Sequence, residues 1–420
     1  MIFALILFAI TYVLMLTFSK HRTYIALGSA AIFIVSGMLP LEKVFGTIDF
    51  NVLLMIAGSM GLVQLFINSK MPDLLAEIII NKVKNVQMAA VALALFAGII
   101  SAFVDNVATV LMVAPVAMQI CKKLNTNPVP FIIAIAVSSN LQGAATLVGD
   151  TTSIMLGGEA GMSFLDFFWY QGRPSIFFAV ELGAIVSAFI VAFVFRKEKQ
   201  PIPKQETNTK VTDYVPTVLL LSMLALLIGA SFIENKPAIT NGLICCTLLV
   251  IGLTYNFIKY KNKETVLSVV KAIDFQTLGL LLGLFLMIGG ITEQGVIASA
   301  VNLLAKLGGG NEFLLFTIIV WASVLISAFI DNIPYVATML PIISGLGINP
   351  TLLYFGLLSG ATLGGNCTPI GASANITGTA ILRKDGYEVK NKDFFKIGIP
   401  FTLTAVISAY LYLWLVYGSH

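Results

Sequence analysis

Charged side chains are what this sequence has least of. Only 11% of its 420 residues are charged, and 58% are hydrophobic. Soluble globular proteins carry a charge on roughly a quarter of their residues, so the composition excludes that class and indicates a polytopic membrane protein that is surrounded by the lipid bilayer. The two histidines, His21 and His420, are too few for a histidine proton relay.

Catalytic and cofactor motifs are also missing. No Walker A motif is present, so the chain does not hydrolyse ATP by itself, although a separate ATPase subunit is left open as a partner. The four cysteines lack metal-site spacing, and the sequence contains no recognisable nucleophile and base pair. No basic patch with interleaved aromatic residues points to nucleic acid. The sequence therefore predicts a protein that is not an enzyme, needs no cofactor and binds no nucleic acid.

Ten apolar segments are each long enough to cross a hydrocarbon core of about 30 Å, which takes about 20 helical residues. They are residues 2–18, 24–40, 51–67, 130–157, 175–195, 215–233, 239–258, 275–292, 351–381 and 397–416. Basic residues concentrate in alternate loops, above all in the linker 196–213, and cytoplasmic loops carry the excess of Lys and Arg. We therefore predict a multi-pass protein of the cell (inner) membrane, with both termini outside and the linker in the cytoplasm.

Two matching stretches place a carboxylate between apolar limbs. Residues 101–115 read SAFVDNVATVLMVAP and residues 327–341 read SAFIDNIPYVATMLP, which agree at seven of fifteen positions. The Asp-Asn pair is Asp105-Asn106 in the first stretch and Asp331-Asn332 in the second. Because an acidic side chain at a bilayer centre costs roughly 2.5 to 3.5 kcal/mol, these residues indicate a functional site.

The same stretches lie in segments that must begin and end on one side of the membrane if the loop charges set the orientation. Residues 87–120 and 313–343 are therefore predicted to form helical hairpins. Their return limbs would rise about 21 and about 16 Å, less than a full crossing, so re-entrant hairpins with Asp-Asn at the tip are favoured over four full spans. Residues 72–84 and 295–307 predict amphipathic helices at opposite interfaces.

The duplication divides the chain into two halves. Residues 1–195 hold the first hairpin and residues 214–420 hold the second, and each half has five spans. An odd number of spans inverts one half relative to the other, as in many secondary transporters. The predicted fold is an all-α polytopic membrane protein of two inverted-topology repeats, with ten spanning helices, two of them broken, and two re-entrant helical hairpins.

A glycine-rich segment follows each hairpin, at residues 138–158 and 359–378. An unbroken helix over residues 351–381 would run about 46 Å, which is too long for the bilayer core. We therefore predict a break near residues 364–371, where Pro369 and several glycines favour unwinding. Unwound backbone and half-helix ends can hold ions and polar solutes near the membrane midplane.

Polar residues of the tips and breaks define the predicted substrate and ion site. It comprises Asp105, Asn106, Thr109, Asn140, Gly143, Thr146, Asp150, Thr151, Asp331, Asn332, Asn366, Thr368, Ser373 and Asn375. The coupling ion would be a proton or sodium, with sodium held at the two Asp-Asn pairs. Asp150 has no acidic counterpart in the second half, where Ala372 takes the matching place. The role of Glu181 is left open between a proton carrier and a residue that reaches the outer interface.

At these residues the chain resembles the ion transporter superfamily, in particular its citrate transporter-like branch, which includes arsenite permeases, sodium/proton antiporters and the melanosomal P protein. The tip SAFIDNIPY at residues 327–335 and LGGNCTPIGASANI at residues 363–376 carry the resemblance, which covers nearly the whole chain. It implies an elevator-type transporter, usually a homodimer, with its site at the hairpin tips and broken helices. The dicarboxylate members carry Ser-Asn-Thr at both tips, where this chain has Asp-Asn-Val and Asp-Asn-Ile.

The favoured function is a secondary active transporter of a small inorganic or organic ion that resembles the arsenite/anion permeases and is driven by a proton or sodium gradient. The alternative is a sodium/proton antiporter that uses Asp105 and Asp331 directly, and an ion channel on the same fold is less favoured. The added carboxylates would repel a dianion unless cations or protons neutralised them. The sequence leaves the substrate, the stoichiometry and the direction of transport open.

Overall fold

Helices form nearly all of the computed structural model, which describes residues 1–202, 209–211, 213–261 and 263–419. Among these residues the strands are one short antiparallel pair, β1 (Trp169–Tyr170) and β2 (Arg173–Pro174). Six of the described helices are long and apolar enough to cross a membrane by length and composition. The prediction of an all-helical membrane protein is confirmed. The number of ten spans and the two inverted repeats stay predictions. Residues 203–208 and 212 of the linker lie outside the described residues.

The helices follow one another along the chain with short connections. Up to residue 194 they are α1 (Ile2–Thr17), η1 (Ser19–His21), α2 (Arg22–Val35), α3 (Leu41–Thr47), α4 (Phe50–Asn68), α5 (Met71–Lys82), α6 (Val86–Ser101), α7 (Asn106–Leu124), α8 (Val129–Gly143), α9 (Thr151–Glu159), η2 (Leu165–Phe167) and α10 (Ile176–Val194). From residue 215 they are α11 (Val215–Ser231), α12 (Thr240–Tyr260), α13 (Lys263–Ala272), α14 (Phe275–Glu293), α15 (Val296–Gly308), α16 (Glu312–Ser327), α17 (Asn332–Leu346), α18 (Pro350–Gly364), η3 (Gly365–Cys367), α19 (Ser373–Lys384) and α20 (Asn391–Tyr417).

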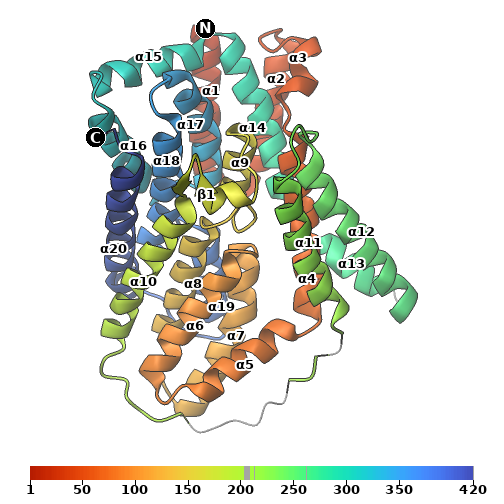
Figure 1. Ribbon diagram of the computed structural model, residues 1–420, viewed down its shortest axis with the longest axis vertical. Coiled ribbons are helices and arrows are strands. Elements are labelled where there is room, and N and C mark those ends of the chain that lie inside the picture. The colour runs from red at the N-terminus through yellow and green to blue at the C-terminus, as the bar shows by residue number, and fades with distance from the viewer. Residues whose placement is uncertain (203–208, 212, 262, 420) are drawn as a thin grey trace.

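Both termini lie at one end of the molecule, the upper end in Figure 1, which we call the terminal end. At the opposite end, the linker end, α10 ends and α11 begins. Helix α15 lies across the terminal end and α5 lies across the linker end. These are the two amphipathic helices expected at residues 72–84 and 295–307, and they occupy opposite ends as predicted. Which end faces the cytoplasm stays a prediction.

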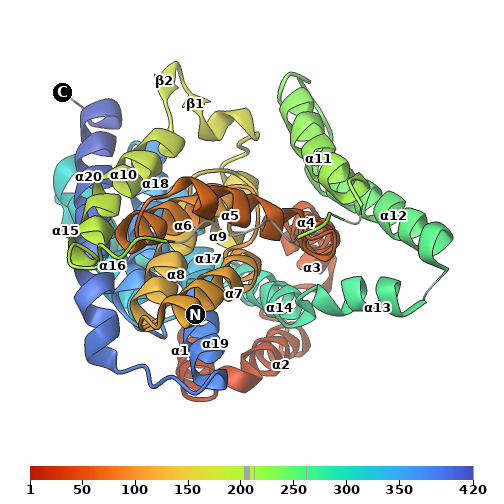
Figure 2. The same ribbon diagram turned by 90° about the horizontal axis from the view of Figure 1, so that it is seen from below.

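The helices pack into two groups. In the first, which we call the scaffold, α4 packs against α12 and α14 packs against α2, with α11 and α1 beside them. In the second, the hairpin group, α6 packs against α8, α16 against α18 and α10 against α20, while α7 and α19 both contact α8. Figure 2 shows α11 and α12 standing on the side of the scaffold that faces away from the hairpin group. Close packing in the scaffold requires glycine, because a Cβ at Gly283 would lie 2.8 Å from the main-chain carbon of Ala26.

Each predicted hairpin region contains two successive helices that meet at the Asp-Asn pair, and the second helix is longer than expected. That these regions are re-entrant stays a prediction. Helix α6 turns into α7, which ends at Leu124, and α16 turns into α17, which ends at Leu346, beyond the predicted ends at residues 120 and 343. With 19 residues, α7 is long and apolar enough to cross a membrane, so the prediction of a limb shorter than a crossing was wrong for this helix. The reason is that the predicted limb ended with the apolar run at Ile120, whereas α7 continues through Lys122 and Lys123. Pro115 and Pro341 lie inside these helices. Membrane helices tolerate proline where neighbouring groups satisfy the freed carbonyl.

Each hairpin turns at its aspartate. Oδ1 of Asp105 accepts hydrogen bonds from the main-chain N–H groups of Val107 and Ala108 at 3.0 and 3.1 Å. Oδ1 of Asp331 accepts one from the N–H of Ile333 at 3.1 Å. Aspartate is among the best N-cap residues, and its charge is favourable at a helix N-terminus. Both aspartates therefore start the return limb of their hairpin, whatever else they do.

The two glycine-rich segments are broken, as predicted. Helix α8 ends at Gly143 and α9 begins at Thr151, while α18 ends at Gly364 and α19 begins at Ser373 after the short turn η3. The predicted break at residues 364–371 therefore falls between two half-helices.

Each break is fixed to the first limb of its own hairpin by the same contacts. The Thr146 hydroxyl donates to the carbonyl of Ala102, and the Thr368 hydroxyl donates to the carbonyl of Ala328. A glycine sits at the close approach in both places, and a Cβ at Gly149 would lie 2.6 to 2.8 Å from three main-chain carbonyl oxygens. Tip and break are thus held as one unit in each half of the chain.

Candidate functional site

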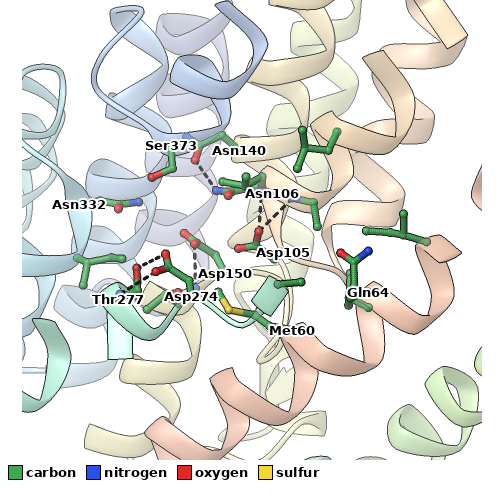
Figure 3. A pocket seen from close by; sticks show the side chains of 18 residues that line it. Met60, Gln64, Asp105, Asn106, Asn140, Asp150, Asp274, Thr277, Asn332 and Ser373 are labelled. Carbon is green, nitrogen blue, oxygen red and sulfur yellow. Dashed lines mark hydrogen bonds between the residues drawn. The ribbon is translucent and has the colours of Figure 1, made fainter. Parts of the chain in front are cut away.

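One cavity of about 240 Å³ gathers residues from both hairpin tips and from both breaks (Figure 3). Of the predicted site residues, it is lined by Asp105, Asn106, Asn140, Asp150, Thr151, Asn332 and Ser373. The scaffold residues that line it include Gln64 and Ile67 near the end of α4 and Asp274 just before α14. Because α4 leads into α5 at the linker end, this site cavity lies toward that end of the scaffold.

Three carboxylates line the site cavity, and each of them caps a helix. Asp105 caps α7 through the two main-chain hydrogen bonds given above. Asp150 caps α9 and accepts from the Thr152 hydroxyl at 2.7 Å. Asp274 caps α14, accepting from the Thr277 N–H at 3.0 Å and from its hydroxyl at 2.6 Å. These hydrogen bonds hold the three side chains in place before any ion arrives.

No lysine, arginine or histidine is among the described residues that line the site cavity. Carboxylates that converge without a basic partner attract cations and repel anions. Within the described ranges, no group of three or more His, Cys, Asp or Glu side chains is placed to share one metal ion. The described lining is therefore acidic and polar, without a basic side chain.

The second tip differs from the first. Asp331 does not line the cavity, because its carboxylate forms an ion pair with Arg22 at the start of α2. The neighbouring Asn332 does line the cavity and is 8% exposed (Figure 3). Its side-chain amide makes no hydrogen bond with any residue that the structure describes. Asn332 is thus the polar side chain of the second tip that lines the cavity.

A buried network of amides lies beside the cavity and joins the two halves of the chain. The Asn106 amide donates to Oδ1 of Asn140 at 3.0 Å. Asn140 in turn donates to Oδ1 of Asn366 at 3.1 Å and to the carbonyl of Thr362 at 2.7 Å. Asn366 donates to the carbonyl of Val137 at 2.9 Å and does not line the cavity. Asn366 therefore holds the two broken segments together and is placed away from a ligand.

The remaining predicted site residues also lie behind the cavity lining. Thr146 and Thr368 fix the breaks to the hairpins, and the Asn375 amide donates to two carbonyls of the second break at 3.1 Å. Gly143 ends α8 where the chain packs against Asp150. Thr109 is fully buried, and its hydroxyl has no partner among the described residues.

Sequence reasoning missed what the scaffold contributes. Met60 and Gln64 of α4, and Asp274 and Thr277 at the start of α14, line the cavity and were not predicted to do so. One signal was present, since Asp274 belongs to the sequence AIDF, which repeats TIDF at residues 47–50. That duplication indicates matching helix starts, but it does not tell which of them faces the hairpin tips.

Glu181 lies apart from the site cavity. Its two carboxylate oxygens accept from Nε2 of Gln142 at 3.0 and 2.9 Å, which joins α10 to α8. The pair is tightly enclosed, because a Cβ at Gly98 of α6 would lie 1.4 Å from Oε1 of Gln142.

The family model described as citrate transporter (CitMHS) matches the chain over residues 6–352 and 264–420. The 46 kDa membrane protein of Mycobacterium leprae is 31% identical, with 99% of both chains covered. An uncharacterized transporter of Mycobacterium tuberculosis is 29% identical, again with 99% of both chains covered. The human P protein is 26% identical over 98% of this chain and 58% of its own length. The predicted resemblance to the citrate transporter-like branch is confirmed.

Two solved transporters share the fold. The YdaH transporter of Alcanivorax borkumensis gives a TM-score of 0.62 at 14% identity, over 89% of this chain and 87% of that one. MtrF of Neisseria gonorrhoeae, from a class described as antimetabolite efflux pumps, gives a TM-score of 0.59 at 15% identity, over 92% and 84%. At such low identity the likeness shows the fold alone.

Proposed function

Because this chain belongs to the citrate transporter family, we propose that it is a secondary active transporter that binds its coupling ion, sodium or a proton, in the site cavity. One observation carries the proposal for the coupling ion. The cavity lining contains Asp105, Asp150 and Asp274 and, among the described residues, no basic side chain. Carboxylates inside membrane proteins often mark ion pathways and proton relays.

Of the two candidate functions, sodium/proton exchange has the stronger support. A free anion in the cavity would meet three carboxylates and would need accompanying cations to offset the repulsion. A cation would be attracted, and protons and sodium would compete for the same carboxylates. We therefore place sodium/proton antiport ahead of the arsenite/anion permease, which reverses the order that the sequence favoured.

The second candidate, transport of arsenite or an anion together with the coupling ion, has one specific support. The N-terminus of α19 meets the cavity at Ser373, and its cap residue Ala372 provides no side-chain hydrogen bond. Free N–H groups at a helix N-terminus favour negative or polar oxygen atoms. At α9 the Asp150 carboxylate already fills this position. A small oxyanion or metalloid would therefore be placed at Ser373 next to a bound cation.

We further propose elevator-type movement of the hairpin group along the scaffold. A second cavity of about 630 Å³ supports this, since it lies at the opposite ends of the same scaffold helices and is lined by Asp49 and Glu293. Asp49 caps α4 there as Asp274 caps α14 in the site cavity. A homodimer, placement in the cell (inner) membrane, outside termini and a cytoplasmic linker complete the proposal, and they rest on the family resemblance and the loop charges.

Proteoliposomes that contain a pH-sensitive dye test the ranking. A sodium gradient alone should move protons in wild-type vesicles, whereas a choline gradient should not. Vesicles with matched amounts of Asp105→Asn protein should stay at background. Flux that begins only when arsenite or an anion is added would favour the second candidate. Sodium flux without trans-stimulation in counterflow would indicate a channel and contradict both.

A further inference from the structure

The ion pair between Arg22 and Asp331 joins the scaffold to a hairpin tip. Arg22 is the first residue of α2, and Asp331 is the residue that caps α17. We propose that Arg22 is a tethered counter-ion, which occupies Asp331 in this conformation and holds the α16–α17 hairpin against the scaffold until the coupling cation takes its place. The identity of the competing cation rests on the function proposed above.

Helix α1 holds the same hairpin next to this ion pair. The Tyr12 hydroxyl donates to the carbonyl of Pro334 at 2.6 Å and forms a hydrogen bond with the Thr338 hydroxyl. Pro334 and Thr338 lie in the first two turns of α17, directly after Asp331. The scaffold pair α1 and α2 therefore contacts the tip and the start of the return limb together, so the hairpin cannot leave the scaffold without breaking the ion pair.

The partial burial of the Arg22–Asp331 ion pair is consistent with a contact that breaks when the hairpin moves. The Arg22 and Asp331 side chains are 27% and 24% exposed, so neither is fully buried nor fully in solvent. A fully exposed pair would hold the hairpin weakly, and breaking a fully buried pair would leave an uncompensated charge in the interior. A half-buried pair contributes to holding the hairpin and still lets an ion reach the carboxylate. Asn332, one residue along the chain, already lines the site cavity.

The first tip has no such counter-ion. Among the described residues, Asp105 accepts hydrogen bonds only from main-chain N–H groups of its own helix. Since the two tips share the Asp-Asn sequence and the same cap, the difference between them comes from Arg22. In the absence of a cation, Arg22 neutralises Asp331 and keeps the hairpin in place. This arrangement would prevent the empty carrier from moving with a bare carboxylate at its second tip.

A labelling experiment in sodium-free buffer tests whether Arg22 holds the hairpin. In a background without native cysteines, Leu111→Cys places a reporter thiol on α7 in the cavity lining, where Leu111 is 50% exposed. Arg22→Gln should lower the rate of maleimide labelling about fivefold, because the carrier then leaves this conformation more often. Arg22→Lys keeps the charge and should stay within about twofold of the wild-type rate. Lys20→Gln removes a charge from the same loop, at a side chain without an ion pair in the described structure, and should leave the rate unchanged.

Equal labelling rates in Arg22→Gln and Lys20→Gln would overturn the proposal. If Arg22→Gln does not fold, Asp331→Asn removes the same pair from the other side and should slow labelling to a similar extent. Where Arg22→Gln does fold, combining it with Asp331→Asn should add nothing to either change alone, because the two side chains act as one pair.

Sodium binding tests the competition. Measured by thermal stabilisation of the purified protein, sodium should bind Arg22→Gln about fivefold more tightly than wild type, since Asp331 has lost its built-in partner. Unchanged sodium affinity in a folded Arg22→Gln variant would refute the competition. If neither sodium nor protons stabilise the wild type, the proposed function fails, whereas the labelling rates still decide whether Arg22 holds the hairpin.

Discussion

Replacing Asp105 by asparagine removes one negative charge from the site cavity and leaves the turn of the hairpin intact. The side-chain oxygen of asparagine can accept the hydrogen bonds that Asp105 accepts from Val107 and Ala108 at 3.0 and 3.1 Å. Asparagine is about as good an N-cap residue as aspartate. We therefore expect unchanged expression and folding, so that a loss of ion binding reports the charge itself.

The size of the effect follows from the position of Asp105 in the cavity. A carboxylate about 4 Å from a monovalent cation contributes about 4 kcal/mol at an effective dielectric constant of about 20, which sets an upper limit of about a thousandfold in affinity. Removing the ion and the carboxylate from water offsets part of this energy. A net contribution of about 1.5 to 3 kcal/mol, which is typical of charged hydrogen bonds, predicts sodium binding that is weaker by about tenfold to about a hundredfold.

The assay is the rise in unfolding temperature of purified protein as sodium is added, because a ligand that binds only the folded state stabilises it by an amount that grows with the logarithm of its concentration relative to its Kd. Asp49→Asn is the matched control. It makes the same change at an aspartate that caps a helix, α4, in the second cavity and outside the site cavity, and should leave sodium binding unchanged. If Asp105→Asn shows the wild-type dependence on sodium, the cavity carboxylate does not bind the ion and the reasoning is refuted.

Three further changes test other parts of the structure. Asp274→Asn should weaken sodium binding at least about tenfold, whereas Asp49→Asn, the same change at the cap of α4 in the other cavity, should not. Gly149→Ala should lower stability by about 1 to 3 kcal/mol, because its Cβ meets main-chain carbonyls, while Gly28→Ala, with nothing within 4 Å, should not lower the unfolding temperature. Burial raises the pKa of the Asp213 carboxyl. The hydrogen bonds that it accepts and its ion pair with Lys259 outweigh burial and hold the pKa below 3.8. The stability that this lowered pKa contributes is present above pH 3.8 and is lost as the pH falls through the lowered pKa. In thermal unfolding scans, Asp213→Asn should therefore be less stable than wild type near pH 6 and should approach the wild-type stability below pH 3.8.

The hairpins and breaks could be predicted because their causes are local. An Asp-Asn pair between apolar limbs caps the next helix, and a cluster of glycines with Pro369 cannot continue one. The same local reasoning failed at the end of the first return limb, which was predicted where the apolar run ends, at Ile120. The helix continues through Lys122 and Lys123 to Leu124.

The composition of the site could be predicted only in part, because it depends on which distant segments meet. Asn140 and Asn366 were both expected at the ligand, yet one lines the cavity and the other ties the breaks together behind it. Asp274 entered the site because α14 begins beside the first tip. Arg22 and Asp331 are 309 positions apart in the chain, and nothing near either residue in the sequence indicates their ion pair.

Matching tips with different partners are what a transporter with two conformations requires. Asp105 and Asp331 each cap a helix through one side-chain oxygen, so the local structure at the two tips is alike. Their positions against the scaffold make that difference, since Asp105 shares the site cavity with Asp274 while Asp331 meets Arg22. A shift of the hairpin group toward the terminal end would separate both pairs in one movement. Asp331 would then need a cation in place of Arg22, and Asp105 would lose the repulsion of Asp274, so that ion exchange at the two tips is tied to the displacement of the helices that carry them.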